Sequence, residues 1–168
     1  RSGGLSSGIK TFTWDLENAI IDIEALRFAD CIVHLAGANV GAGRWSKKRK
    51  KEILDSRTQS IVLIKDLLER HDIKVESFIC ASGIGYYGDA GDKVLEESDN
   101  VVKSDFLSEV CIEWEKTAKS LASLCRVVSV RVVFVLSANS EAYNKLLQPI
   151  KLGVGSPLGS GKQFVSWI

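Results

Sequence analysis

The sequence predicts an α/β protein built on a doubly wound parallel sheet. Three short apolar runs alternate with two longer segments whose apolar residues recur every three or four positions. This order of strand, helix, strand, helix and strand is typical of a parallel sheet covered by helices. At 168 residues, the chain has the length of one domain and can bury a hydrophobic core.

The first elements follow from local patterns. Alternation predicts a short strand at Thr11–Asp15, and a mixed polar and apolar pattern predicts a helix at about Leu16–Phe28. The apolar run Cys31–Gly37 ends in glycine and is typical of a buried parallel strand. Ser46 is a favoured residue type before a helix, which predicts the start of a long helix at about Lys47–Arg70.

The second half of the chain continues the alternation. Glu76–Gly83 predicts a second buried strand, a helix with one apolar face is expected at about Asp105–Leu124, and Arg126–Leu136 predicts a third strand because it is rich in β-branched residues. Ligands bind outside the carboxyl ends of the strands in such sheets. The functional site is therefore expected at the segments HLAG, ASGIGYYG and FVLS.

Composition and charge exclude several classes of protein. Apolar residues make up 45% and charged residues 26%, and the formal net charge is +1, so nothing steers the chain toward nucleic acid or membrane. No apolar run approaches the roughly 20 residues that cross a bilayer. The four cysteines lie far apart, which predicts reduced, mostly buried thiols and no metal site. We expect a cytoplasmic protein.

The long helix carries a charge within its buried stripe. That stripe consists of Ile53, Arg57, Ile61, Ile64 and Leu68. A buried guanidinium needs an anionic partner, because an unpaired buried charge is costly. Two partners remain open for Arg57: a carboxylate of the protein, or a phosphate or carboxylate of a ligand. Glu52 either accepts hydrogen bonds from a ribose or pairs with a lysine.

The loop after the second predicted strand offers three hydroxyls. Ser82 can hydrogen-bond a carbonyl or hydroxyl substrate, and Tyr86 or Tyr87 can donate a proton. The structural alternative is that Ser82 caps a turn while the tyrosines fill the underside of the loop. His34, in a buried strand, is interpreted as a core residue, and His71 as a solvent-facing one.

Two further motifs point to structure rather than to a ligand. The basic run SKKRKK at the start of the long helix is interpreted as a solvated face, because neither the net charge nor interleaved aromatic residues favour nucleic acid. The segment Gly153–Lys162 does not have the glycine and lysine spacing of a phosphate-binding P-loop. It predicts a tight turn.

Four segments occur in the order typical of a known family: HLAGANVGAGRWSKKRKKEILDSRTQS, ASGIGYYGD, DFLSEVCIEWE and IKLGVGSPLGSGKQFVSWI. From about Trp14 to Ile168 the chain resembles the epimerase-family branch of the extended short-chain dehydrogenase/reductase superfamily, whose members are often named nucleoside-diphosphate-sugar epimerases. The resemblance implies a Rossmann-like doubly wound parallel sheet that binds NADP, with NAD the less favoured cofactor. It also implies a small-molecule substrate such as a nucleotide sugar or carbonyl compound.

The same resemblance implies a set of cofactor-binding residues. They are Arg1, Leu35, Ala36, Gly37, Glu52, Arg57 and Val135. The segment Leu35–Gly37 would pass the adenine side and the pyrophosphate. Arg1 resembles the arginine that follows the family's second strand beside a 2′-phosphate, which favours NADP over NAD.

Two features depart from the family's pattern. Its members begin with a glycine-rich strand-turn-helix and continue past SWI into a substrate-binding portion, so we expect this chain to be a partial Rossmann domain from a longer protein. The family's Tyr-x-x-x-Lys pair falls on Leu107 and Cys111, which cannot move a proton. Catalysis would then rest on Ser82, Tyr86 and Tyr87, with Ser82 orienting the substrate and Tyr87 supplying the proton.

Three functional hypotheses follow. The first is an NADP(H)-binding oxidoreductase or sugar-nucleotide epimerase-like enzyme, favoured by the tyrosine-bearing loop. The second is a non-catalytic NADP(H)-sensing binding module, favoured by the absence of the Tyr-x-x-x-Lys pair. A nucleic-acid partner for the basic run is the least favoured. Exposed helices in this fold class also lead us to expect a homodimer.

Overall fold

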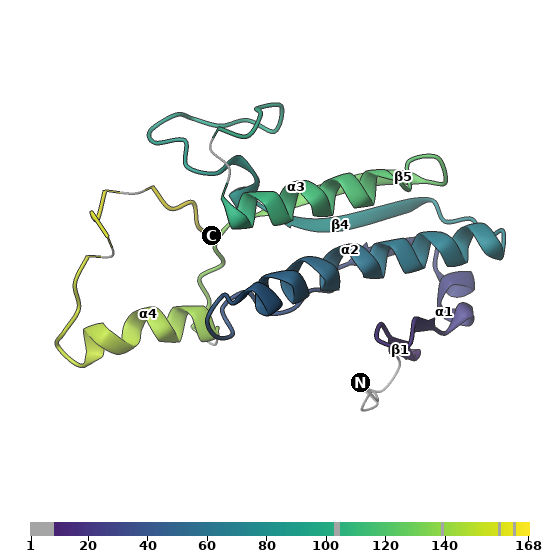
Figure 1. The fold of residues 1–168 in the computed structure, drawn as a ribbon, viewed down its shortest axis with the longest axis horizontal. Helices are drawn as coiled ribbons and strands as arrows, with labels where there is room; N and C mark the ends of the chain where they lie inside the picture. Colours follow the sequence, from purple (N-terminus) through teal and green to yellow (C-terminus); the bar gives the residue numbers. More distant parts are fainter. Residues whose placement is uncertain (1–8, 103–104, 139, 158, 163) are drawn as a thin grey trace.

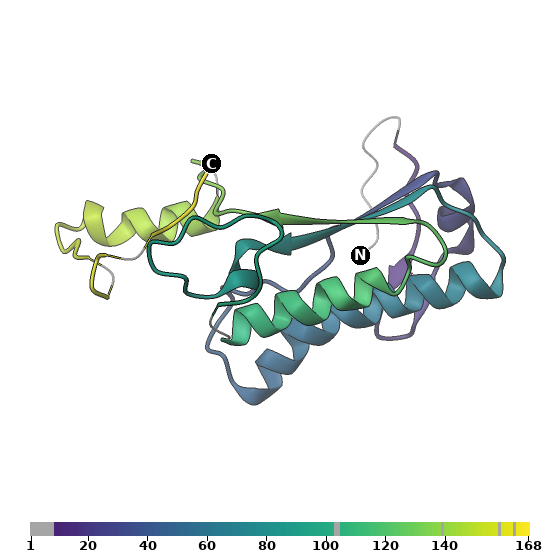
Figure 2. The same cartoon turned by 90° about the horizontal axis from the view of Figure 1, so that it is seen from above.

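A three-stranded parallel sheet forms the centre of the computed structural model, which describes residues 9–102, 105–138, 140–157, 159–162 and 164–168. The strands lie in the order β3 (Cys31–His34), β4 (Ser77–Gly83) and β5 (Arg126–Val132). Two helices, α2 (Lys47–Arg70) and α3 (Phe106–Lys119), connect successive strands and lie side by side on one face of the sheet (Figure 1, Figure 2). The predicted α/β class and parallel sheet are confirmed.

The register of the sheet brings the predicted site together at one edge. β4 pairs in parallel with both neighbours, and Ser82 at its carboxyl end lies beside Arg131 of β5. β3 ends at His34, which pairs with Cys80. The loops after β3 and β4 therefore leave the sheet in the same direction, as ligand-binding loops of parallel sheets do.

Both covering helices begin at side-chain caps. The Ser46 hydroxyl accepts a hydrogen bond from the Arg49 amide at 3.2 Å, as predicted. Asp105 and Ser108 form a reciprocal capping box at the start of α3. These caps satisfy free amides of the first turn and fix where each helix begins.

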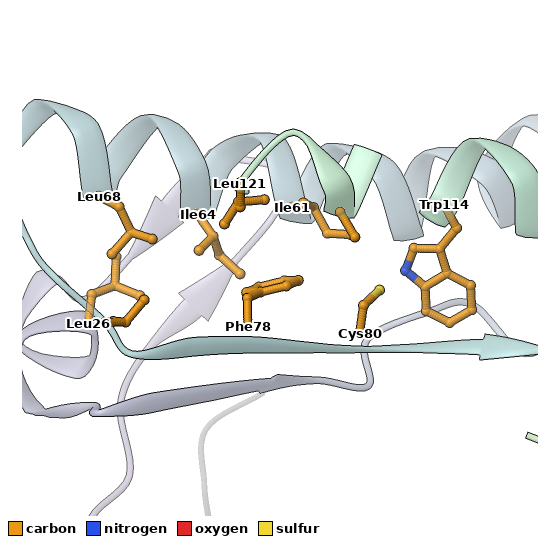
Figure 3. Packing of buried hydrophobic residues seen from close by; sticks show 10 residues of the cluster. Leu26, Ile61, Ile64, Leu68, Phe78, Cys80, Trp114 and Leu121 are labelled. Atoms are coloured by element: carbon orange, nitrogen blue, oxygen red, sulfur yellow. The ribbon is translucent and has the colours of Figure 1, made fainter. Parts of the chain in front are cut away.

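The core lies between the sheet and the two helices (Figure 3). Phe78 is fully buried at its centre, and its truncation to Ala is expected to cost about 3–5 kcal/mol. The cluster comprises Leu26, Ile61, Ile64, Leu68, Val75, Phe78, Cys80, Trp114, Ala118 and Leu121. Among the cysteines, Cys80 and Cys111 are buried and Cys31 is exposed. Within the described residues, no helix is long and apolar enough to cross a bilayer.

The helix expected at Leu16–Phe28 is helical only in its second half. A two-stranded antiparallel ribbon comes first, formed by β1 (Trp14–Asp15) and β2 (Ile20–Ile21). Helix α1 then covers Ile23–Phe28. The expectation was wrong for residues 16–22.

Aspartate side chains explain this difference. The Asp15 carboxylate accepts hydrogen bonds from the amide and the side chain of Asn18, at 3.2 and 2.7 Å, and closes a turn. Asp22 accepts from the Glu24 amide and caps α1 at its later start. Short polar side chains compete with helix formation in this way.

The C-terminal part projects away from the sheet (Figure 1). Strand β5 ends at Val132 rather than at the expected Leu136, and beyond it Phe134 forms an isolated parallel bridge with Trp167. Helix α4 (Glu141–Lys151) was not predicted; Ser140 caps it by accepting from the Tyr143 amide at 3.1 Å. Gly153 follows α4 with φ of 72°, a value that glycine adopts without strain.

Candidate functional site

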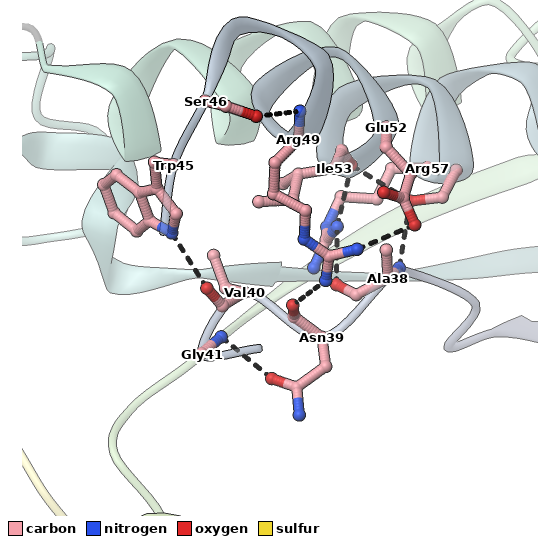
Figure 4. A network of polar contacts seen from close by, with 11 residues as sticks. Ala38, Asn39, Val40, Gly41, Trp45, Ser46, Arg49, Glu52, Ile53 and Arg57 are labelled. Atoms are coloured by element: carbon pink, nitrogen blue, oxygen red, sulfur yellow. Dashed lines mark hydrogen bonds and ion pairs between the residues drawn. The ribbon is translucent and has the colours of Figure 1, made fainter. Parts of the chain in front are cut away.

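Arg57 lies at the carboxyl end of β3, inside the stripe of α2 residues predicted to be buried. Only 8% of the residue is exposed, and Ile53 and Ile61 on either side are fully buried. Its Nη1 donates to the Ile53 carbonyl at 2.8 Å and to the Ala38 carbonyl at 3.2 Å (Figure 4). The guanidinium also lies over the Trp114 ring, 4.9 Å from its centre.

No carboxylate neutralises Arg57 among the described residues, where every ion pair involves other side chains. Its two protein hydrogen bonds use both hydrogens of Nη1 and leave the Nη2 and Nε hydrogens for another partner. Burial, and secondarily the charge of Arg49, lowers the pKa of Arg57. Arginine stays charged nonetheless, so an unpaired buried cation lies at this strand end.

Gly37 packs directly on this guanidinium. A Cβ atom at position 37 would come within 2.9 Å of Arg57 Cζ and 3.1 Å of Nη2. Such distances are too short for a side chain, so only glycine fits without a shift of Arg57. The neighbouring Leu35 is 73% exposed at the end of β3, and Ala36 is partly buried.

Glu52 pairs with an arginine rather than with the lysine considered in the sequence. Its carboxylate lies 2.7 Å from Nη1 of Arg49, whose Nη2 donates to the Asn39 carbonyl (Figure 4). The Ala38 amide donates to the Ser56 hydroxyl at 2.9 Å. Side chains of α2 therefore hold the backbone of the loop after β3 at Ala38 and at Asn39.

The remaining predicted cofactor residues lie elsewhere. Arg1 is outside the described residues. Val135 is half exposed and follows β5, next to the Phe134 that pairs with Trp167. The structure thus brings Gly37, Glu52 and Arg57 together at the loop after β3.

Ser82 forms part of a charged network at the ends of β4 and β5. Its hydroxyl donates to Glu115 Oε1 at 2.7 Å. Arg131 holds the same carboxylate with two parallel hydrogen bonds, Nε to Oε1 and Nη2 to Oε2, both 2.8 Å. Burial opposes ionisation of Glu115, but the bonds from Arg131 and Ser82 prevail and lower its pKa.

The two tyrosines are held differently. The Tyr87 hydroxyl is buried, donates to the Glu96 carbonyl at 3.0 Å and accepts from Arg131 Nη1 at 2.7 Å. The Tyr86 ring stacks on the Arg131 guanidinium, 3.6 Å from its centre, and its hydroxyl has no hydrogen-bond partner among the described residues. Arg131 thus orders the short 3₁₀ helix η1 (Ile84–Tyr87) that carries both phenols.

Leu107 and Cys111, at the family's Tyr-x-x-x-Lys positions, lie beside the carboxyl end of β4 and the start of η1. A Cβ at Gly85 would contact Leu107 at 3.7 Å, and one at Gly83 would contact the Cys111 sulfur at 3.7 Å. Burial raises the pKa of Cys111. Neither an aliphatic chain nor a neutral thiol can replace tyrosine and lysine as a proton-transfer pair.

His34 lies in the core, as predicted. It is 3% exposed; its Nε2 hydrogen-bonds the Ser60 hydroxyl at 2.8 Å, and its ring stacks on Phe78. Burial, with a smaller effect from the Arg57 charge, lowers its pKa to about 4. His71, which follows α2, is exposed as expected.

Glu115 and Arg131 are the site residues that the sequence analysis missed. Glu115 follows Cys111 by one helical turn, which places it near the buried stripe. The alternation of the third strand gives no such signal for Arg131, because Val128, Val130 and Val132 form its more apolar face and Arg131 lies on the other. In the structure the face of Arg131 is the inward one, since Val127 on that face packs against the core.

No protein-family model matches the chain. Epimerase family protein Mb2239 of Mycobacterium bovis is 35% identical over 156 residues, which are 92% of this chain and 51% of that protein. The chain spans about half the length of the relatives it matches.

Solved structures share the fold. The crystal structure of human epimerase family protein SDR39U1 with NADPH matches with a TM-score of 0.73 and 31% identity, over 83% of this chain and 48% of the human one. The nucleoside-diphosphate sugar epimerase from Corynebacterium glutamicum matches with a TM-score of 0.70 and 29% identity, over 93% and 32%. These matches confirm the predicted Rossmann-like architecture and the resemblance on which it rested.

Proposed function

Because the chain belongs to the epimerase family of the extended short-chain dehydrogenase/reductase superfamily, we propose that it binds NADP(H) at the carboxyl ends of β3 and β4. In this proposal it works as an oxidoreductase or epimerase on a small molecule, for example a nucleotide sugar or a carbonyl compound. The cofactor would give or accept a hydride. The protein would position the reacting group beside the loop after β4.

The observation that carries the proposal is the unpaired Arg57. A buried guanidinium without a carboxylate is costly unless a ligand supplies the anion. Its Nη2 and Nε hydrogens form the planar fork that phosphate and carboxylate groups accept. A cofactor phosphate beside Gly37 would neutralise it, and the structure of the human relative with NADPH supports this choice of ligand.

The preference for NADP over NAD rests on Arg1, through its resemblance to the family's 2′-phosphate residue. The loop after β3, held by Arg49 and Ser56, would lie along the cofactor, with Glu52 and Val135 at its margins. Replacement of Arg1 by Ala is expected to weaken NADPH binding while leaving NADH binding unchanged.

For the chemistry, we propose that Ser82 contacts the reacting group and that a phenol of η1 moves the proton. Tyr87 was the predicted donor, and to act it must release the Glu96 carbonyl. Tyr86 has the more available hydroxyl and stacks on a cation. The single substitutions Tyr86→Phe and Tyr87→Phe separate the two, since only the donor's replacement should slow turnover more than tenfold.

The alternative is an NADP(H)-sensing module without turnover, favoured by Leu107 and Cys111 at the family's Tyr-x-x-x-Lys positions. A titration of the full-length protein with NADPH and NADH, followed by hydride transfer to a panel of carbonyl compounds, decides between them. Binding of NADPH with turnover supports the enzyme, and binding without turnover supports the sensor. If neither nucleotide binds, both are excluded.

A further inference from the structure

The direction of one hydrogen bond at Ser82 limits what this residue can recognise. A serine hydroxyl has a single hydrogen and two lone pairs. The hydrogen of Ser82 is directed to Glu115 Oε1 at 2.7 Å. A ligand that reaches this oxygen therefore meets lone pairs, and only a hydrogen-bond donor can pair with them.

Glu115 cannot reverse that bond while it is ionised, because a carboxylate only accepts. Arg131 keeps it ionised with two charge-assisted hydrogen bonds of 2.8 Å. Arg131 is itself held from the opposite side by the Tyr87 hydroxyl and the Glu97 carbonyl, at 2.7 and 3.1 Å. The side chains of Glu115 and Arg131 are only 15% and 17% exposed, so water competes weakly for these bonds.

Cys111 also lies near the Ser82 hydroxyl, but it does not compete for the hydrogen. Burial raises the pKa of Cys111, so its sulfur stays a neutral thiol and a weak acceptor. An ionised carboxylate at 2.7 Å is the stronger partner. The orientation of Ser82 is thus set by Glu115.

We propose that Glu115, held by Arg131, is a positioning residue that makes Ser82 a hydrogen-bond acceptor, so that the site recognises a substrate hydroxyl in preference to a carbonyl. The inference rests on the proposed function, since it assumes that Ser82 faces the reacting group. It adds to that function a preference for the alcohol form of the substrate over the carbonyl form. Glu115 acts only through Ser82 and does not touch the substrate.

The first test uses cyclohexanol and cyclohexanone as a matched alcohol and ketone. Their dissociation constants are measured by ligand-observed NMR with the full-length protein in the presence of NADP. We expect the alcohol to bind about fivefold more tightly, which is the ratio that one neutral hydrogen bond supplies. A ketone that binds as well as the alcohol, or the binding of neither compound, overturns the inference.

Variants separate positioning from folding. In Glu115→Gln the amide oxygen is drawn to Arg131 and the NH₂ group turns to Ser82, so the preference is expected to disappear or reverse. Ser82→Ala should also remove it. Arg131→Lys keeps a cation beside an ionised Glu115, and Ser82→Thr keeps the hydroxyl, so both should retain it. An unchanged preference in a folded Glu115→Gln protein contradicts the role of Glu115.

A neutron structure of the full-length protein provides a readout independent of any ligand and of the variants' folding. Deuterium on the line from Ser82 Oγ to Glu115 Oε1 is expected. Deuterium directed away from Glu115 overturns the inference. If the wild-type protein does not bind NADP but still prefers the alcohol, the proposed cofactor is rejected and the role of Glu115 stands. Failure of the proposed function and failure of this inference are therefore distinguishable.

Discussion

Arg57, which extends from α2 to the loop after β3, and Arg131, at the carboxyl end of β5, have opposite electrostatic environments. Arg131 holds the Glu115 carboxylate with two hydrogen bonds, and these bonds are the main reason why the pKa of Arg131 is raised. Arg131 also orders the loop of Tyr86 and Tyr87. Arg57 is more deeply buried, and burial lowers its pKa. Among the described residues its hydrogen bonds go to backbone carbonyls alone, and its guanidinium lies over an indole ring.

The difference separates a cation that is paired within the fold from a cation that, in the proposed function, binds a phosphate of the cofactor. Removal of one member of a buried pair such as Arg131 and Glu115 destabilises the folded protein strongly, because the other charge is left buried without a partner. An unpaired buried charge is a cost in the free protein that an anionic ligand removes.

The largest effect is the expected difference in stability between the variants in which one or the other arginine is replaced by Met. Arg131→Met leaves Glu115 without its cation and should lower the free energy of unfolding by about 4 kcal/mol. Arg57→Met removes an uncompensated buried charge and should change it by no more than about 1 kcal/mol. Urea unfolding of both variants measures this, and equal losses would remove the contrast.

The next effect is a loss of stability in mild acid, caused by His34. The pKa of His34 is about 4 in the folded protein and about 6.5 in the unfolded chain, so the unfolded state binds the proton first as the pH falls. The free energy of unfolding should fall by about 3 kcal/mol from pH 7 to pH 4 on this account, and level off below pH 4.

His34→Gln should lose that part of the pH dependence, because Gln can bond Ser60 without titrating. His71→Gln is the matched control, since His71 is exposed. Unfolding curves at intervals of half a pH unit compare the three proteins. A wild-type curve that parallels the His34→Gln curve between pH 7 and pH 4 would show that His34 is not held neutral.

A smaller effect is expected from a methyl group at Gly37. Gly37→Ala forces Arg57 to move and should cost about 1–2 kcal/mol of stability, with weaker NADPH binding. Gly41→Ala, in the same loop, meets only the Asn39 side chain at 3.5 Å and should change stability by less than about 0.5 kcal/mol. Thermal unfolding with and without NADPH measures both, and equal effects would contradict the packing of Gly37 on Arg57.

The smallest effect links Arg57 to His34. The Arg57 charge contributes to the lowered pKa of His34, although burial dominates. Arg57→Met should therefore raise the pKa of His34 without restoring its ordinary value, and NADP bound at Arg57 should act in the same direction. Titration of the His34 ring by NMR follows both changes. A pKa that does not move in either case would place the charge of Arg57 too far away to matter.

Much of the fold was predictable because its signals are local and periodic. The α2 stripe, its Ser46 cap and the alternation of three strands with two helices along the chain follow from spacing and residue type. The N-terminal ribbon was missed because the side chains of Asp15 and Asn18 form a turn in a segment whose pattern also suits a helix.

The candidate site was predictable only one residue at a time. Arg57 was conspicuous as a charge within an apolar stripe, but its contact with Gly37 depends on the packing of a loop against a helix. The Glu115–Arg131 pair joins a helix to a strand 16 residues apart in the chain, and its register follows from tertiary packing. Spacing in the sequence carries no information on such distances.

The most direct test of the account is a fluorescence titration of the full-length protein with NADPH, comparing the wild type with Arg57→Met. The exposed Arg70 at the end of the same helix provides the control variant Arg70→Gln. We expect at least a tenfold loss of affinity in Arg57→Met, equivalent to about 1.4 kcal/mol, and wild-type affinity in Arg70→Gln. Wild-type affinity in a folded Arg57→Met protein would contradict the proposed role of Arg57.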